Sequence, residues 1–307
     1  MKYAVVMTAS YDLLPGVNAV LNGLAYYGNK ADAYILTWGE EWTSYIDGAK
    51  KAFPFATFID LPDYVKQRDG KVNDSVQFYT CVYRYVFGSD LADYDAVYIP
   101  DADFMILNDL TPYFEMTALG DRILCANHVC GDNHDCCTEE VYDICNAPLQ
   151  SATTFFNPKK FAWLIKQIEF YCKEHRVAEM VGLNYAIIHG GHMKDKVFLL
   201  PDVLWLQIKL GDMPLLRKDA CGKRWLCLAN GERLNALHGR WWYGFNMEKF
   251  SLEKDSPDWS SHKNWTFRHV WEMYHFLNTQ CRHNIPWREE WGHPDMWSKI
   301  GSGHRWD

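Results

Sequence analysis

Two aspartates separated by a single residue, Asp101 and Asp103, directly follow an apolar run at residues 96–99. The run is typical of a buried strand, and alternate residues of an extended chain lie on the same side. Two carboxylates this close repel each other unless a cation lies between them. Oxygen ligands suit Mg²⁺ or Mn²⁺, whose coordination is commonly completed by a substrate phosphate. The pair therefore indicates a metal–diphosphate site, and a surface turn with two hydrated acids is the alternative.

Strands and helices alternate through the first half of the chain, which predicts how this pair is positioned. Pro15 opens a helix that Gly28 closes, and Asp74 is placed to cap another helix that runs to residue 87. We expect strands at residues 2–8, 33–36, 56–59 and 96–99. Such alternation indicates an α/β fold with a largely parallel sheet and right-handed crossovers. In sheets of this kind ligands bind at the carboxyl ends of the strands.

The second half continues with more strands and longer helices. We expect strands at 123–126, 152–156, 197–200 and 234–237, and helices at 157–175, 182–189 and 262–281. Beyond about residue 250 the chain becomes rich in Trp, His and charge. We therefore divide it into a main domain, residues 1–250, and a Trp-rich, mostly helical extension, residues 251–307.

Composition excludes several classes of function. The chain has 307 residues, is 48% hydrophobic and 23% charged, and carries a net charge of −8, which argues against nucleic acid as a partner. Its first apolar run is too short for a signal peptide, and none approaches the roughly 20 residues that span a bilayer. We therefore expect a cytoplasmic protein whose ten cysteines are free thiols or metal ligands.

Three other places could carry chemistry near the acidic pair. The first strand runs into Thr8, Ala9 and Ser10, small residues that let a ligand approach the backbone, and Tyr11 offers a face for a base to stack on. An ordinary βα loop would look the same.

Arg84 lies in an aromatic helix, where a guanidinium pairs with a buried carboxylate, binds a ligand phosphate or lies on a hydrated face. His238 ends a late strand, so its imidazole could join the carboxylates on Mn²⁺ while Arg240 neutralises a phosphate. A turn histidine is the alternative there.

A cysteine- and histidine-rich segment lies between Cys125 and Cys145. Thiolates and imidazoles are zinc ligands, although the spacing matches no standard zinc motif. Reduced thiols in a surface loop are the other interpretation.

The order of these parts resembles the GT-A glycosyltransferases, and specifically the glycogenin-like family 8 group. The resemblance covers about residues 1–245: the loop at 5–11, the helical Arg84, the acidic strand at 94–103, a segment Glu179-Met-Val-Gly-Leu-Asn184 similar to Asp-Gln-x-x-Leu-Asn, and His238-Gly-Arg-Trp-Trp242. The chain departs from the family pattern at Pro100, at Glu179 and Met180, and in the absence of a Lys-Pro pair after His238.

The resemblance implies a Rossmann-like GT-A domain with a mixed central sheet and a metal-dependent transfer of sugar from a nucleotide-diphosphate sugar, a UDP-sugar above all, with retention. It assigns Mn²⁺ or Mg²⁺ to Asp101, Asp103 and His238. The implied donor site comprises Thr8, Ala9, Ser10, Tyr11, Arg84, Asp101, Ala102, Asp103 and Arg240. On the acceptor side it points to Asn157, Glu179 and Asn184, with a carbohydrate or glycosylated acceptor as partner.

Two other functions remain open. A sugar-phosphate nucleotidyltransferase uses a related sheet, but it needs a glycine-rich basic loop that Ala9-Ser-Tyr-Asp12 does not provide. A catalytically silent, carbohydrate-binding relative would keep the shell and use its many Trp residues. The extension beyond residue 250 could cover the site, bind an acceptor glycan or form a homodimer.

Overall fold

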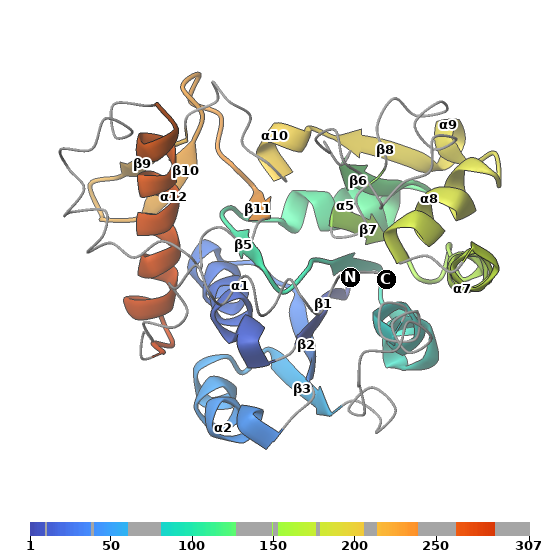
Figure 1. The fold of residues 1–307 in the computed structure, drawn as a ribbon, viewed down its shortest axis with the longest axis horizontal. Coiled ribbons are helices and arrows are strands. Elements are labelled where there is room, and N and C mark those ends of the chain that lie inside the picture. The colour runs from blue at the N-terminus through green and yellow to red at the C-terminus, as the bar shows by residue number, and fades with distance from the viewer. Residues whose placement is uncertain are drawn as a thin grey trace.

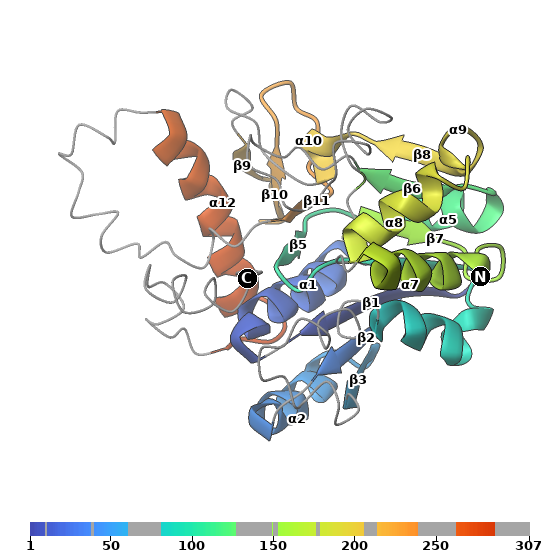
Figure 2. The ribbon, with the colours of Figure 1, turned by 45° about the vertical axis from the view of Figure 1, so that its right-hand side comes forward.

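A seven-stranded sheet forms the centre of the molecule (Figures 1 and 2). The computed structural model describes residues 1–9, 11–37, 40–60, 81–126, 149, 153–175, 179–205, 214–238 and 262–285. The strand order is β3-β2-β1-β4-β7-β6-β8. The strands are β1 (Tyr3–Ala9), β2 (Asp32–Thr37), β3 (Ala56–Asp60), β4 (Ala96–Ile99), β6 (Ile123–Ala126), β7 (Thr154–Phe156) and β8 (Val197–Leu200).

The sheet is mixed, as predicted, because one strand runs against the others. β1 pairs in parallel with β2 and β4, β2 with β3, and β6 with β8, whereas β7 is antiparallel to both β4 and β6. Reversing direction twice across β7 leaves β6 and β8 parallel to β4. Every strand of this sheet except β7 therefore ends at the same edge, which we call the carboxyl edge.

Helices cover both faces of the sheet. Their bounds are α1 (Leu14–Tyr27), α2 (Thr43–Ala52), residues 81–88, α5 (Thr111–Leu119), α7 (Trp163–His175), α8 (Glu179–Ile188), α9 (Met193–Lys196), α10 (Asp202–Trp205) and α12 (His262–Thr279). Short 3₁₀ turns lie at Tyr11–Leu13, Glu40–Trp42 and Asp90–Asp93. Side chains along β1 point alternately to the two faces of the sheet, so the strand contributes to the hydrophobic core on each face. Val5 and Met7 pack with α1 and α2 on one face, and Ala4 and Val6 pack with residues 81–88, α7 and α8 on the other.

Most expected elements are present, and the exceptions have local causes. The helix expected from residue 157 begins only at Trp163, because Asn157 forms a turn first: its backbone carbonyl accepts hydrogen bonds from the amides of Lys160 and Phe161. Helices α2 and α5 were not expected. The helix cap at Asp74, the segment 127–148, and residues 239–261 and 286–307 lie outside the described residues.

A second, two-stranded sheet lies over α1. It pairs β5 (Phe104–Ile106) with β11 (Ala236–His238) in antiparallel register, with Phe104 opposite His238. The strand ending near His238 was expected, whereas β5 was not. The α1 helix reaches β5 at Gly23, where an added Cβ would lie 2.3 Å from the carbonyl oxygen of Ile106.

The described part of the extension, residues 262–285, packs on the same helix. The side-chain amide of Asn18 donates to Asn278 Oδ1 at 3.0 Å, and that of Asn22 donates to the carbonyl of His283 at 2.8 Å. The amide of His283 returns a bond to Asn22 Oδ1 at 3.1 Å. Fully buried amides bonded in this way fix one docking geometry. No helix among the described residues has both the length and the apolar character needed to cross a membrane.

A third sheet pairs β9 (Leu215–Lys218) with β10 (Arg224–Cys227) beside α12 (Figure 2). Its residues Leu226 and Leu228 join a core with Val270, Met273 and Leu277 of α12. This core also contains Met105 and Leu237, so it connects the extension to the β5–β11 pair.

Gly23→Ala tests the close approach of α1 to β5. The new methyl group cannot fit against a backbone oxygen, so we expect the free energy of unfolding in urea to fall by about 1–3 kcal/mol, despite the better helix propensity of alanine. Gly88→Ala is the matched control, because its added Cβ would meet nothing within 4 Å. Equal stability of the two variants would contradict the packing argument.

Candidate functional site

Asp101, Asp103 and His238 come together at the carboxyl edge of the sheet. Nε2 of His238 lies 3.4 Å from Asp101 Oδ2 and 3.2 Å from Asp103 Oδ1. One ligand atom from each residue can be chosen so that all three lie within 4.8 Å of one another. Two carboxylates and one imidazole form a donor set suited to Mn²⁺ or Mg²⁺. The structure thus brings together the three residues that the sequence proposed as metal ligands.

Local backbone geometry explains this convergence. After β4 ends at Ile99, the chain makes a tight turn in which the amide of Phe104 donates to the carbonyl of Asp101. Asp103 is buried there, whereas the Asp101 side chain keeps 48% of its surface exposed. The register of β5 and β11 sets His238 opposite Phe104, and the two rings stack with their centroids 4.8 Å apart. The imidazole is therefore held flat against one strand with its Nε2 directed at the acids.

The charges of the two acids control the protonation of His238. Burial lowers the pKa of the imidazole, but the charge of Asp103 and hydrogen bonds to both carboxylates outweigh it, raising the pKa from 6.5 to about 10. The metal-free site at neutral pH therefore holds a proton between the acids and the imidazole. A metal ion that takes His238 as a ligand has to displace that proton.

The first loop reaches the same edge of the sheet. Ala9 ends β1 fully buried, Thr8 precedes it, and Tyr11 opens the turn before α1. The ring of Tyr11 is partly buried and makes an edge contact with Trp42, 5.7 Å between centroids. Ala102 is buried between the two acids. Ser10 and Arg240 lie outside the described residues.

Two other expected site residues are occupied by contacts within the protein. The guanidinium of Arg84 forms an ion pair with Glu169 of α7. Asn184 is fully buried: its amide donates to the carbonyls of Leu149 and Met180 at 2.8 and 2.7 Å, and its oxygen accepts from the amide of Leu149 at 2.7 Å. Asn184 therefore fastens residue 149 to α8. Glu179 is the first residue of that helix.

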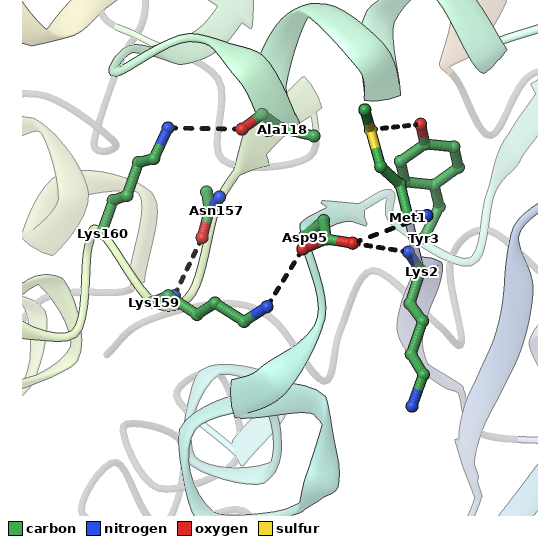
Figure 3. Close-up of polar contacts among 8 residues, drawn as sticks. All are labelled: Met1, Lys2, Tyr3, Asp95, Ala118, Asn157, Lys159 and Lys160. Carbon is green, nitrogen blue, oxygen red and sulfur yellow. Dashed lines mark hydrogen bonds and ion pairs between the residues drawn. The ribbon is translucent and has the colours of Figure 1, made fainter.

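Asn157 lies at the opposite edge of the sheet. Because β7 is antiparallel to β4, with Phe156 opposite Val97, its carboxyl end faces the start of β4. Figure 3 shows Asn157 there with Lys159 and Asp95: Oδ1 of Asn157 accepts from the amide of Lys159, whose ammonium bonds Asp95. The structure does not bring Asn157 to the acidic pair.

Sequence reasoning missed a buried polar group on the β6–β7 side of the carboxyl edge. Cys125 Sγ lies 3.8 Å from Thr153 Oγ1 and 3.6 Å from Thr154 Oγ1, and Thr153 accepts from the amide of Ala126. The sequence predicts Cys125 at the start of a cysteine-rich segment, as a zinc ligand or a reduced thiol, and gives no sign of the two threonines beside it. Because β7 runs antiparallel to β4 and β6, its first residues lie at the edge where the acids lie. The direction of a strand cannot be read from its composition.

Comparison with solved structures places this arrangement in a known fold. The galactosyltransferase LgtC, solved with donor and acceptor sugar analogues, superposes with a TM-score of 0.52 at 14% identity, covering 94% of this chain and 98% of LgtC. The chain has the GT-A glycosyltransferase fold. No protein-family model matches the sequence, and no curated protein is significantly similar to it.

Two further glycosyltransferases share parts of the structure. GlyE of Streptococcus pneumoniae TIGR4 gives a TM-score of 0.43 at 19% identity over 66% of this chain, which spans 46% of GlyE. Mouse xyloside xylosyltransferase 1 gives 0.42 at 13% identity, covering 67% of this chain and 87% of the enzyme.

The raised pKa of His238 predicts how metal affinity depends on pH. Below about pH 10 the imidazole is protonated in the metal-free protein, so Mn²⁺ has to expel one proton, and affinity should rise up to about tenfold per pH unit between pH 6.5 and 8.5. Isothermal titration calorimetry at several pH values measures this slope. Because the buffer takes up the released proton, the observed binding enthalpy should also vary with the ionisation enthalpy of the buffer.

His238→Gln should bind Mn²⁺ more weakly and show a flatter pH slope, because glutamine has no proton to lose. His189→Gln, at the exposed end of α8, is the control and should keep the original slope. A wild-type affinity that does not change with pH would contradict the proton displacement.

Proposed function

We propose that the protein is a metal-dependent glycosyltransferase that moves a sugar from a nucleotide-diphosphate sugar, a UDP-sugar in the first instance, to a hydroxyl of a glycan, protein or small molecule. The observation that carries the proposal is the convergence of Asp101, Asp103 and His238 at the carboxyl edge of a GT-A sheet. Ligands bind at this edge in open α/β sheets. The transfer is proposed to retain the anomeric configuration.

The donor set fits Mn²⁺ or Mg²⁺. Asp101 and Asp103 supply oxygen ligands and His238 a nitrogen, and the tight turn and the β5–β11 register hold them in place. When bound, the metal supplies Lewis-acid stabilisation of the charge that develops on the leaving diphosphate.

The chain's own residues position the donor. Thr8 and Ala9 have small side chains at the carboxyl edge, so a nucleoside can approach their backbone closely. Ser10 and Tyr11 follow them in the sequence and are proposed to complete this part of the donor site. Asp103 is buried and Asp101 half-exposed, so the diphosphate is expected to approach from the side of Asp101. Arg240 follows His238 by two residues and is proposed to neutralise a phosphate.

On the acceptor side we propose Glu179, with Asn184 in a positioning role. The side-chain amide of Asn184 bonds both the backbone of Leu149 and the carbonyl of Met180, so it holds Leu149 against α8. Arg84 acts through Glu169 and steadies the packing of residues 81–88 against α7.

The deciding experiment measures UDP release from a panel of UDP-sugars with Mn²⁺, with and without simple sugar acceptors. Asp103→Asn should lower metal-dependent release at least about 100-fold, because a lost metal ligand removes several kcal/mol of charge stabilisation. Asp121→Asn is the matched control, since its side chain is 74% exposed and its ion pair with Lys196 lies away from the acidic pair.

If no UDP-sugar is turned over and calorimetry detects no UDP binding with Mn²⁺ present, the transferase proposal fails. Sugar binding without nucleotide binding would then favour a catalytically silent carbohydrate-binding protein. Formation of a nucleotide sugar from a sugar phosphate and a nucleoside triphosphate would favour a nucleotidyltransferase.

A further inference from the structure

Two arginines and a tryptophan share the outward face of the β9–β10 hairpin. Arg217 and Trp225 lie directly opposite each other in the antiparallel register, and Arg233 bridges Cys227 on the other side of β10. Directly opposed residues, and residues two apart on one strand, point to the same face. Arg217, Trp225 and Arg233 therefore form one surface, which we call the arginine–tryptophan face.

The side chains on this face are arranged for recognition. The guanidinium carbon of Arg233 lies 4.4 Å from the centre of the Trp225 ring, a cation–π contact that holds the planar group in place. Both arginines are exposed and Trp225 is half-buried. A guanidinium fixed in this way presents its N–H groups as a fork that fits a carboxylate or a phosphate.

The arginines of the face have no carboxylate partner within the part of the chain that the structure describes. The two nearby acids are engaged in turns: Asp219 accepts from the amides of Cys221 and Lys223, and Glu232 accepts from the side chain of Asn230. These two cations, without a carboxylate partner among the described residues, belong to a protein with a net charge of −8.

Two other basic residues of the hairpin pack against aromatic rings of the helices. Arg224 lies over Phe276 of α12 at 4.3 Å, and Lys223 lies over Tyr27 of α1 at 5.6 Å. These cations serve packing against the body of the protein. The packing side and the arginine–tryptophan face therefore use basic residues for different purposes.

The face is connected to the candidate site through the backbone. Arg233 precedes His238 by five residues, and the chain between them forms β11. Five extended residues span at most about 18 Å, which is the length of a few sugar units. The face thus lies within reach of a chain of sugars whose end is at the metal ligands.

We propose that the arginine–tryptophan face binds an anionic stretch of the acceptor glycan, with carboxylates or phosphates on Arg217 and Arg233 and a sugar ring against the exposed edge of Trp225. The proposal rests on the proposed glycosyltransferase function and names the class of its acceptor.

A glycan fits this face better than a membrane or a nucleic acid. Surfaces that bind membranes combine inserted apolar side chains with basic ones, or carry clusters of four or more basic residues. The exposed large apolar residues of the described chain lie on other elements: Met1, Met116, Leu119, Phe170, Phe198 and Leu199. A nucleic acid presents a continuous row of phosphates that needs a broad basic surface, and two arginines do not form one.

Binding of a tetrasaccharide of galacturonic acid, compared with maltotetraose, tests the proposal. We expect the acidic tetrasaccharide to bind the full-length protein more tightly than the neutral one and to weaken with added salt. Arg217→Gln with Arg233→Gln should weaken acidic binding at least about tenfold, a loss that calorimetry resolves. Lys50→Gln with Lys51→Gln removes the same charge from α2 and should leave the affinity unchanged.

Activity provides a second, separate readout. With UDP-sugar and Mn²⁺, hydrolysis of the donor by water should be the same in the wild type and the double arginine variant, whereas transfer to the acidic acceptor should fall in the variant alone. Absence of UDP-sugar turnover in every variant would refute the proposed function, while the binding comparison would still decide the role of this face.

Three results would overturn the proposal. Equal binding of acidic and neutral tetrasaccharides, or unchanged binding by the double arginine variant, would show that the face does not recognise glycan charge. Arginine-dependent binding to phosphatidylcholine vesicles containing phosphatidylglycerol, without binding of the acidic tetrasaccharide, would assign the face to a membrane.

Discussion

The candidate site depends on the antiparallel pairing of β5 with β11. Asp101 and Asp103 follow β4, but two carboxylates alone have no fixed counter-charge and would repel each other. The pairing brings His238 from a distant part of the sequence to within 3.4 Å of both acids. Stacking on Phe104 then fixes the ring. A shift of one residue in register would turn His238 to the other face, so the convergence of the three candidate ligands depends on this register.

Helix α1 packs against β5 and connects the β5–β11 pair to the extension. Gly23 admits the β5 backbone on one side of the helix, and Asn18 and Asn22 hold the turn after α12 on another. Buried amides are costly unless their partners are in place, which makes this docking specific rather than merely apolar. The described part of the extension, residues 262–285, is therefore built into the support of the site.

Sequence reasoning succeeded where the signal was local. The strands at 96–99, 123–126 and 197–200 have the predicted bounds, because continuous apolar runs between turns have few other interpretations. The three candidate metal ligands were chosen by residue type and by the order of motifs, and the structure brings them together. What failed depended on pairing between distant segments: β5 is three residues long and has no period of its own.

Asn157 shows the same limit in another form. It follows a strand of the sheet, as the acidic pair does. A residue after a parallel strand would lie at the carboxyl edge, whereas β7 runs antiparallel to both neighbours. Direction within a sheet is set by tertiary pairing, which a run of three buried residues does not encode. The reversal that removed Asn157 from the site also brought Thr153 and Thr154 to it.

Net charge describes this protein poorly because its charges act locally. A chain at −8 should repel both a diphosphate and an acidic glycan. At the candidate site the two acids repel each other unless a cation lies between them. Under the proposed function that cation would neutralise the bound diphosphate. A metal at this site would not neutralise charges several sugar units away along an acceptor. Interactions between exposed charges are largely screened beyond roughly 8 Å at physiological salt. An acidic acceptor would therefore need its own cations. Arg217 and Arg233, which have no carboxylate partner among the described residues, lie on a face within that reach.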